Sequence, residues 1–208
     1  MAVFCTDLQN FAECTTDSVK MRFYRKVGKT PQNSAFFRSL KGEIMSIRVL
    51  FVCLGNICRS PLAEFYFKDL VAKHNLSAEF YIESAATSYE ETGNPVHPGT
   101  RKKLAAAGIS CAGKTARCME REDYRKFDYL IGMDQANIRN ITQIAGGDPE
   151  KKIYKMLEFA GDGWKELKAG KRNPDKVPDV ADPWYTGNFD DTWRDVTAGC
   201  QGLLKFLS

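Results

Sequence analysis

Short apolar runs recur at intervals along the chain after residue 45. The run IRVLFVC (47–53) is nearly continuous in β-branched and aromatic residues, which is typical of a strand buried on both faces of a parallel sheet. The segments EFYIESAA (79–86), DYLIGM (128–133) and KKIYKML (151–157) are predicted to be strands as well. The pattern therefore predicts four strands in this part of the chain.

Helix-forming segments lie between these runs. Ser60 and Pro61 are expected to open the first helix, with Ser60 as its N-cap, because both residue types favour such positions. Asp134 is interpreted as the N-cap of a later helix rather than as a second acid. Further helices are predicted in the segments 99–108, 120–127, 135–145 and 189–207, and a long loop rich in Gly, Pro, Lys and Asp is predicted at 158–181.

Strand and helix alternate throughout this region. Such alternation predicts an α/β fold: a single domain with a four-stranded parallel sheet and helices on both faces, of Rossmann-like type. In sheets of this kind, ligands bind at the carboxyl ends of the strands. The first strand is therefore expected to deliver residues 53–60 into a site.

The first 44 residues differ from the rest in pattern and in charge. They show neither period clearly, and they carry seven Lys and Arg against four Asp and Glu, which is most of the chain's formal net charge of +4. We therefore place a boundary at about residue 45 and predict a poorly ordered N-terminal extension (1–44) before one domain (45–208). The near-neutral domain argues against a nucleic-acid partner, which usually requires a basic face.

The cysteine content and the length of the apolar runs indicate the cellular compartment in which we expect the protein. No apolar run approaches the ~18 residues of a membrane-spanning helix, and the N-terminus lacks the basic-then-apolar build of a secretory signal. The odd count of seven cysteines fits a reducing compartment, and the pairs Cys53/Cys58 and Cys111/Cys118 are spaced too widely for zinc. We expect a cytoplasmic protein without metal, cofactor, membrane or nucleic-acid partner, monomeric or weakly self-associating.

The segment CLGNICRSP (53–61) carries the candidate chemistry. A loop between strand and helix points backbone N–H groups inward and adds the positive end of the helix dipole. Gly55 and Asn56 tolerate the positive φ that a tight ring requires. Arg59 can offer a bidentate fork to two oxyanion oxygens, and the same donors favour the thiolate of Cys53. The loop therefore predicts a thiolate nucleophile beneath a tetrahedral oxyanion.

A structural cysteine followed by an ordinary turn is the alternative interpretation of this loop. A bare C-x5-R pattern occurs by chance and carries little information. Here a strand precedes the pattern, Gly55 and Asn56 lie within it, and Ser60-Pro61 opens a helix directly after it. This combination favours the catalytic interpretation.

The run VCLGNICRSPLAE (52–64), together with DPWYTGNF (182–189), resembles the low-molecular-weight protein tyrosine phosphatase family. The resemblance covers about residues 45–208, and residues 1–44 match nothing in the family. Further matching segments are SAATS (84–88), TGNP (92–95) and FDYLIGMD (127–134).

The resemblance implies a role for each matching residue. Cys53 would attack phosphorus and form a cysteinyl-phosphate, Arg59 would bind the phosphoryl group, and Asp182 would protonate the leaving phenolate and then activate water. Ser60 would stabilise the thiolate, and Asn56 would hold the strained loop. The implied substrate is a phosphotyrosine protein or a small aryl phosphate, the product is inorganic phosphate, and the implied substrate-binding residues are Leu54, Gly55, Asn56, Ile57, Cys58, Ser60, Tyr89, Trp184 and Tyr185.

Several residues leave alternatives open. Tyr89 is as well explained by an exposed loop aromatic as by a pocket wall, whereas lining the site is the favoured interpretation of Trp184 and Tyr185. Lys114 stands where many family members have a His that supports the phosphate loop, which puts that support in question. Cys58 is a candidate for a reversible disulfide with Cys53 under oxidation.

Three other functions are alternatives to a tyrosine phosphatase. Arsenate reductases share the fold, and Cys111 and Cys118 are candidates for the resolving thiols that such an enzyme requires. Phosphoarginine phosphatases usually have Thr at the position of Ile57, which makes that activity less favoured. A non-catalytic phosphotyrosine-binding protein would be expected to lose Cys53, Arg59 or Asp182, and all three are present.

Overall fold

The computed structural model describes residues 46–208. The predicted extension, residues 1–44, and the boundary at about residue 45 lie outside the described residues. Within them, no helix is long and apolar enough to cross a membrane. No cluster of three His, Cys, Asp or Glu side chains suited to a metal ion occurs in the same part of the chain.

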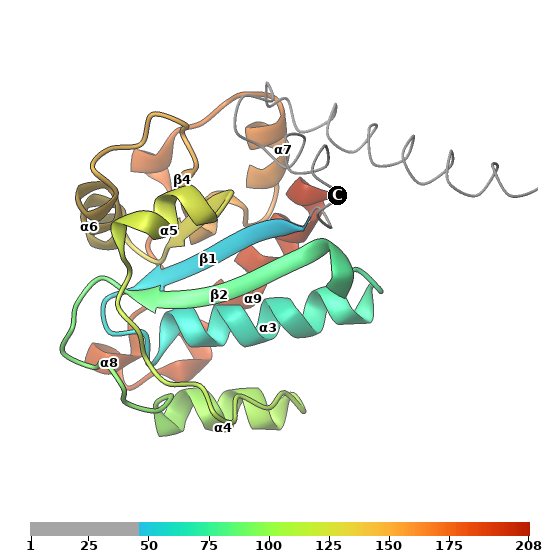
Figure 1. Ribbon diagram of the computed structural model, residues 1–208. Helices are drawn as coiled ribbons and strands as arrows, with labels where there is room; N and C mark the ends of the chain where they lie inside the picture. The colour runs from blue at the N-terminus through green and yellow to red at the C-terminus, as the bar shows by residue number, and fades with distance from the viewer. Residues whose placement is uncertain (1–45) are drawn as a thin grey trace, which may run out of the picture.

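Four parallel strands form one sheet in the order β2–β1–β3–β4 (Figure 1). Because β1 is central, its carboxyl end lies beside the ends of β2 and β3, and Cys53 is paired with Ala86 of β2. The predicted α/β fold with a four-stranded parallel sheet is confirmed. The strands are β1 (Ile47–Cys53), β2 (Phe80–Ala86), β3 (Tyr129–Gly132) and β4 (Ile153–Lys155).

Helices cover both faces of the sheet, as predicted (Figure 1). The side chains of β1 alternate between two cores: Val49 and Phe51 pack with the helices of one face, and Leu50 and Val52 pack with those of the other. Both faces of β1 are therefore apolar, which explains its continuous apolar sequence. The first face is covered by α3 (Arg59–Lys73) and α9 (Phe189–Leu207), and the second by α5 (Arg121–Lys126) and α6 (Gln135–Ala145).

The prediction of one long loop at 158–181 is wrong. A short helix, α7 (Gly163–Lys168), interrupts it, and Trp164 and Leu167 of this helix pack against the α9 face of the core. These two apolar residues, three apart, provide a helical face that the surrounding Gly and Lys residues conceal in the sequence. The other elements are α4 (Pro98–Ala106), α8 (Pro183–Thr186) and the 3-10 turns Ser77–Glu79, Met156–Glu158 and Pro174–Lys176.

The ends of two helices test the capping predictions. In α6, the Asp134 carboxylate accepts a hydrogen bond from the Asn137 amide at 2.6 Å, and Gly146 ends the helix at φ +77°, so both ends lie where predicted. The assignment of Ser60 as an N-cap is wrong, because α3 already begins at Arg59 and its N-cap is Cys58. The Ser60 hydroxyl instead faces the interior, where it serves the candidate site.

Candidate active site

The loop from Cys53 to Arg59 connects the carboxyl end of β1 to the first turn of α3. Asn56 adopts the left-handed conformation, with φ +56°, and is fully buried. Gly55 does not lie in that region, so only Asn56 uses the conformational freedom expected of both residues. A buried, left-handed Asn requires side-chain hydrogen bonds to hold it, and the structure provides them.

The sulfur atom of Cys53 lies at the base of this loop. The Asn56 backbone N–H points at the sulfur with an N–S distance of 3.3 Å, and the Ser60 Oγ lies 3.1 Å from it. Only 3 % of the residue is exposed. A buried sulfur with hydrogen-bonding groups from its own loop around it is the arrangement expected of a cysteine nucleophile.

A chain of buried hydrogen bonds runs from this sulfur into the protein. The Asn56 amide nitrogen donates to the Ser60 hydroxyl at 2.8 Å and to the Ser84 hydroxyl at 2.7 Å. On its other side, the Asn56 Oδ1 accepts from the backbone N–H of Arg117 at 3.2 Å. All three polar positions of the Asn56 side chain therefore have partners, which fixes both Asn56 and the hydroxyl next to the sulfur.

The same chain ends on a buried ion pair. The Ser84 hydroxyl donates to the Glu64 carboxylate at 2.6 Å, and the Lys114 ammonium lies 2.8 Å from that carboxylate and donates to the Ser84 carbonyl at 3.2 Å. Burial alone would raise the pKa of Glu64. The charge of Lys114 and hydrogen bonds from Lys114, Lys68 and Ser84 outweigh burial and hold this pKa below its usual range. Lys114 thus contacts the hydrogen-bonded network of the loop through Glu64.

Replacing Lys114 with Met is expected to lower the free energy of unfolding by about 2–3 kcal/mol at neutral pH, because it leaves a buried carboxylate without its closest cation. A group whose pKa is lowered in the folded state contributes stability above its unfolded pKa and loses that contribution as the pH falls. The difference between the variant and the unmodified protein should therefore shrink in mildly acidic solution, because burial without Lys114 favours protonation of Glu64 in the variant, while Lys114 keeps Glu64 ionised in the unmodified protein. Urea unfolding at both pH values measures it.

Lys68→Met is the matched control, because Lys68 also pairs with Glu64, at 2.5 Å, but its side chain is 43 % exposed. We expect a loss below about 1 kcal/mol for this variant, in the range of surface ion pairs. Equal losses for the two variants would show that Lys114 has no special role in holding Glu64.

Arg59 lies at the other end of the loop and is buried. One outer nitrogen is 2.7 Å from an oxygen of Asp134, and the other is 2.6 Å from an oxygen of Asp182. Burial would lower the pKa of Arg59, but Cys53, Asp182 and Asp134 together raise it. The guanidinium is therefore a fixed cation between the loop and two carboxylates.

The sequence did not reveal that Asp134 belongs to this cluster. Its capping role is confirmed, and its second oxygen pairs with Arg59 in addition. A signal was present, because Asp134 follows β3, the strand beside β1, and the carboxyl ends of adjacent parallel strands meet at one edge.

Asp182 is the N-cap of α8. One carboxylate oxygen accepts from the Trp184 backbone N–H at 3.1 Å, while the other faces Arg59. The helix start thus turns the carboxylate toward the loop, although Asp182 lies far from Cys53 in the sequence. The structure therefore brings together Cys53, Arg59 and Asp182, for which the family resemblance implied catalytic roles.

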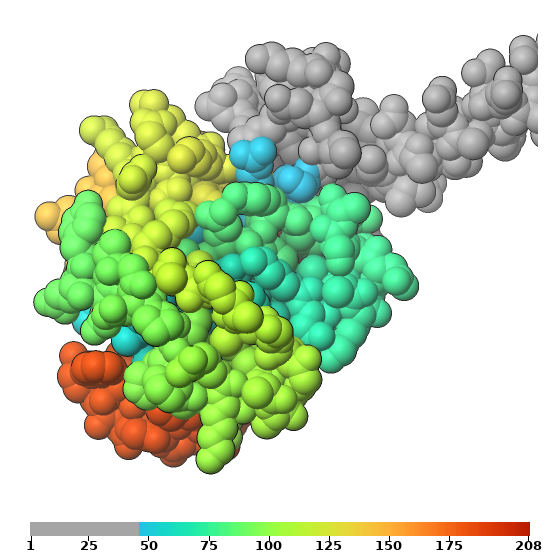
Figure 2. All heavy atoms as spheres, turned by 60° about the horizontal axis from the view of Figure 1, so that its bottom comes forward, coloured from blue at the N-terminus to red at the C-terminus, as the bar shows by residue number. Residues whose placement is uncertain are grey.

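Some of the exposed apolar side chains belong to the segments that carry this cluster. The large apolar side chains that are exposed in residues 46–208 are Leu54, Tyr81, Tyr89, Trp184 and Tyr185. All of them except Tyr81 were predicted to bind substrate. In the space-filling view, light-blue atoms near the start of the described chain are visible between the green segment after β2 and the red segment around α8 (Figure 2).

His97 contacts both the loop from Cys53 to Arg59 and the aromatic residues near Asp182, and it was missed in the sequence. Its backbone N–H donates to the Ile57 carbonyl at 2.9 Å. Its ring stacks on Phe189 with centroids 5.1 Å apart and meets the edge of Trp184 at 6.2 Å. The loop is thereby linked to the aromatic residues next to Asp182.

Comparison with known proteins agrees with this geometry. A family model described as low molecular weight phosphotyrosine protein phosphatase matches residues 48–208. The chain belongs to this family. It is therefore a phosphatase, and the resemblance seen in the sequence is confirmed.

Individual relatives support the assignment. The low molecular weight protein-tyrosine-phosphatase YfkJ of Bacillus subtilis is 40% identical over 161 residues, which are 77% of this chain and 96% of that protein. The crystal structure of YfkJ superposes with a TM-score of 0.68 over 77% of this chain and 93% of that one. The crystal structure of SP-PTP of Streptococcus pyogenes superposes with a TM-score of 0.63 at 39% identity, over 76% of this chain and 91% of that one. The crystal structure of DARP, a Drosophila arginine phosphatase, superposes with a TM-score of 0.63 at 26% identity, over 76% of this chain and 96% of that one.

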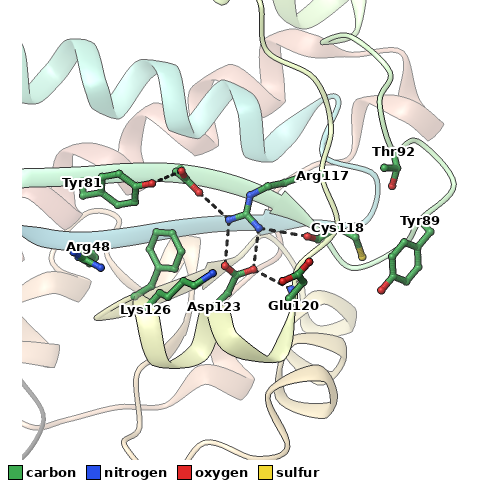
Figure 3. A pocket seen from close by; sticks show the side chains of 11 residues that line it. Arg48, Tyr81, Tyr89, Thr92, Arg117, Cys118, Glu120, Asp123 and Lys126 are labelled. Carbon is green, nitrogen blue, oxygen red and sulfur yellow. Dashed lines mark hydrogen bonds and ion pairs between the residues drawn. The ribbon is translucent and has the colours of Figure 1, made fainter.

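A surface pocket of this phosphatase lies beside the cluster along the edge strand β2 (Figure 3). Of the predicted site residues, only Tyr89 lines it. Its charged centre is occupied by Arg117, which binds Glu83 and Asp123 at 2.9 Å each. These two ion pairs anchor the Arg117 segment, whose backbone N–H holds Asn56.

The other cysteines of the phosphatase differ in environment. Cys58 is buried, and burial together with the nearby Cys53 and Asp182 raises the pKa of its thiol to about 12. Cys111 lies in an apolar cluster with Leu104. Cys118 is half-buried, and its sulfur faces the Ala86 carbonyl at 3.6 Å. Only Cys58 shares the loop with Cys53.

Proposed function

We propose that this phosphatase hydrolyses aryl phosphate monoesters, above all phosphotyrosine in proteins, through a cysteinyl-phosphate intermediate. The observation that carries the proposal is the cluster at the carboxyl end of β1. There the Cys53 sulfur is held by the Asn56 N–H and the Ser60 hydroxyl, and Arg59 lies 2.6 Å from the Asp182 carboxylate. A nucleophile, an oxyanion-binding cation and a carboxyl acid are thus adjacent.

In the first step, the Cys53 thiolate attacks phosphorus and the bond to the phenolic oxygen breaks. The N–H groups of the loop and the Arg59 guanidinium bind the equatorial oxygens, where negative charge develops. The Ser60 oxygen is held 3.1 Å from the sulfur by Asn56, so its hydroxyl can donate to the anion by rotating its hydrogen away from the Ala85 carbonyl. Asp182 supplies a proton to the leaving phenolate.

In the second step, a water molecule attacks the phosphorus of the cysteinyl-phosphate. Asp182, now a carboxylate, accepts a proton from this water, and the sulfur leaves as the thiolate. The products are inorganic phosphate and the regenerated enzyme. Each step is an in-line displacement at phosphorus, so the same donors serve both.

The rim favours an aromatic substrate. Leu54, Trp184 and Tyr185 are exposed and lie next to Cys53 or Asp182 in the chain, Tyr89 is exposed in the segment after β2, and Ile57 contributes an apolar residue to the loop itself. A phenyl ring can pass between such side chains and pack against them while its phosphoryl group reaches the loop.

The five cysteines of residues 46–208 are all free thiols, which supports the proposal that the enzyme acts in the reducing cytoplasm.

Steady-state kinetics on a panel of substrates tests the proposal. We expect the highest kcat/KM for a phosphotyrosine peptide, ready turnover of p-nitrophenyl phosphate, and little activity on a phosphoserine peptide. Arsenate reduction with dithiothreitol is measured alongside, because Cys118 lies near the end of β2. A higher kcat/KM for phosphoserine, or reduction of arsenate at comparable rates, would contradict the proposal.

Phosphoarginine is the second candidate substrate. The observation that favours it is the similarity to the Drosophila arginine phosphatase, at 26% identity over 76% of this chain. Ile57 in the loop and the aromatic rim support phosphotyrosine instead. Phosphoarginine is therefore included in the same panel, and a kcat/KM above that of the phosphotyrosine peptide would reverse the order of the two candidates.

A further inference from the structure

The segment that carries Asp182 is fastened to the body of the protein on both sides. On the side of the sheet, the Val180 N–H donates to the Met133 carbonyl at 2.9 Å. On the side of α9, the Ala181 N–H donates to the Asp195 carboxylate at 3.2 Å, and the Thr192 hydroxyl donates to the Ala181 carbonyl at 2.8 Å. The segment 177–182 is thus held against fixed elements rather than looping freely.

Lys155, the last residue of β4, forms the strongest of these fastenings. Its side chain is only 4 % exposed, and its ammonium lies 2.8 Å from the Asp179 carboxylate and donates to the Val177 carbonyl at 2.5 Å. The same Asp179 oxygen accepts from the Gln135 N–H at 3.1 Å. A buried ammonium persists only where it is paired and hydrogen-bonded, so the location of Lys155 depends on this segment and the segment on Lys155.

The contacts of Asp179 connect this fastening to the cluster around Arg59. Gln135 directly follows Asp134, which pairs with Arg59, and Asp179 comes three residues before Asp182, which pairs with the other nitrogen of Arg59. The Lys155 ammonium therefore adds a link between the end of β3 and the segment that carries Asp182, at the start of that segment. Without this link, the segment before Val180 would lose its charged anchor, and only the hydrogen bonds at Val180 and Ala181 and the pairing with Arg59 would hold Asp182.

We propose that Lys155 is a positioning residue for the general acid, which it keeps in register with the phosphate-binding loop through Asp179 and Val177. This inference rests on the proposed function of Asp182. Proton transfer requires a donor within hydrogen-bond reach of the leaving oxygen, and a displacement of about 1 Å can cost a factor of ~10². The reacting sulfur is held by Asn56 and Ser60, and Arg59 keeps its pairing with Asp134, so we expect both to stay in place when Lys155 is changed.

The test compares Lys155→Met with Lys152→Met on a series of aryl phosphates with increasingly basic leaving groups. Lys152 is the matched control, because its side chain is also buried, at 6 % exposure, but its ammonium faces Glu150 and the ring of Tyr124. For Lys155→Met we expect kcat to fall about 10-fold or more on phosphotyrosine and less than about threefold on the most activated ester. Lys152→Met should leave the leaving-group dependence of kcat unchanged. Lys155→Arg, which keeps the positive charge, should retain most of the kcat on phosphotyrosine.

A double-mutant cycle separates positioning from general damage. In an Asp182→Asn background there is no acid left to position, so Lys155→Met should cause no further loss on phosphotyrosine. The same loss in both backgrounds, or equal losses on all leaving groups, would overturn the inference. If the loss of kcat caused by Asp182→Asn alone is the same for all leaving groups, the proposed function of Asp182 is wrong. The Lys155 inference, which rests on it, is then wrong as well.

Asp179→Asn provides a second route if Lys155→Met does not fold. The Asp179 side chain is 51 % exposed, and the amide oxygen of Asn can still accept from the Gln135 N–H, so the change removes little besides the charge. The expected result is the same leaving-group-dependent loss in kcat, with an unchanged inhibition constant for inorganic phosphate. A normal leaving-group dependence in folded Asp179→Asn overturns the inference as well.

Discussion

Replacing Cys53 with Ser is expected to abolish turnover, while inorganic phosphate and vanadate still bind. The hydroxyl of serine is a far weaker nucleophile than a thiolate, because it is not ionised at neutral pH. The groups that bind the anion, namely the loop N–H groups and Arg59, are unchanged by the substitution. Turnover of p-nitrophenyl phosphate and calorimetric titration with phosphate measure the two properties separately.

Cys118→Ser is the matched control for this experiment. Cys118 is half-buried beside β2, and its sulfur faces the Ala86 carbonyl and interacts with the hydroxyl of Tyr89. This variant should keep its activity on p-nitrophenyl phosphate. Near-native activity in Cys53→Ser would exclude the cysteinyl-phosphate mechanism. Loss of activity in Cys118→Ser would show that Cys118 is a second essential thiol.

Asp182→Asn is expected to slow the hydrolysis of phosphotyrosine by ~10² or more, which is the usual contribution of general acid catalysis. The amide keeps the size of the side chain and its capping hydrogen bond to Trp184, but it has no proton of suitable acidity to donate. Esters of acidic phenols should be less affected, because their leaving groups need little protonation. A plot of log kcat against leaving-group pKa should therefore become steeper in the variant.

Asp175→Asn serves as the control, because Asp175 is exposed in the 3-10 turn Pro174–Lys176 of the same connecting segment. This variant should give the same slope as the unmodified protein. If Asp182→Asn lowers kcat equally for all leaving groups, Asp182 does not donate the proton, and its contact with Arg59 is structural.

Elements with a local signal were predicted with their correct boundaries. Helix α6 has an Asp at its N-cap and a Gly at its left-handed end, and α9 carries an apolar stripe along its whole length. The strand β1 is apolar on both faces because both faces are buried. In each case the residues that determine the element lie within it or next to it.

Three features that depend on distant contacts were not predicted. The Ser60 hydroxyl serves the sulfur of Cys53, so its capping propensity was misleading. Asp134 gains its second partner only when β3 is placed beside β1. The pairing of Lys155 with Asp179 joins two charged residues that look like ordinary solvated side chains in the sequence.

The environment of Arg59 has a consequence for anion binding. One guanidinium faces two carboxylates, so the three side chains together carry a net negative charge when both acids are ionised. Under the proposed mechanism, a phosphoryl group therefore does not meet an unshared cation; it has to exchange with Asp182 for the same nitrogen of Arg59. Asp182 would lose its ion pair in this exchange and keep its capping contact with the Trp184 N–H. Occupation of the loop and release of Asp182 from Arg59 would then be one linked equilibrium, so the binding of the ligand itself would free the carboxyl group that the mechanism requires.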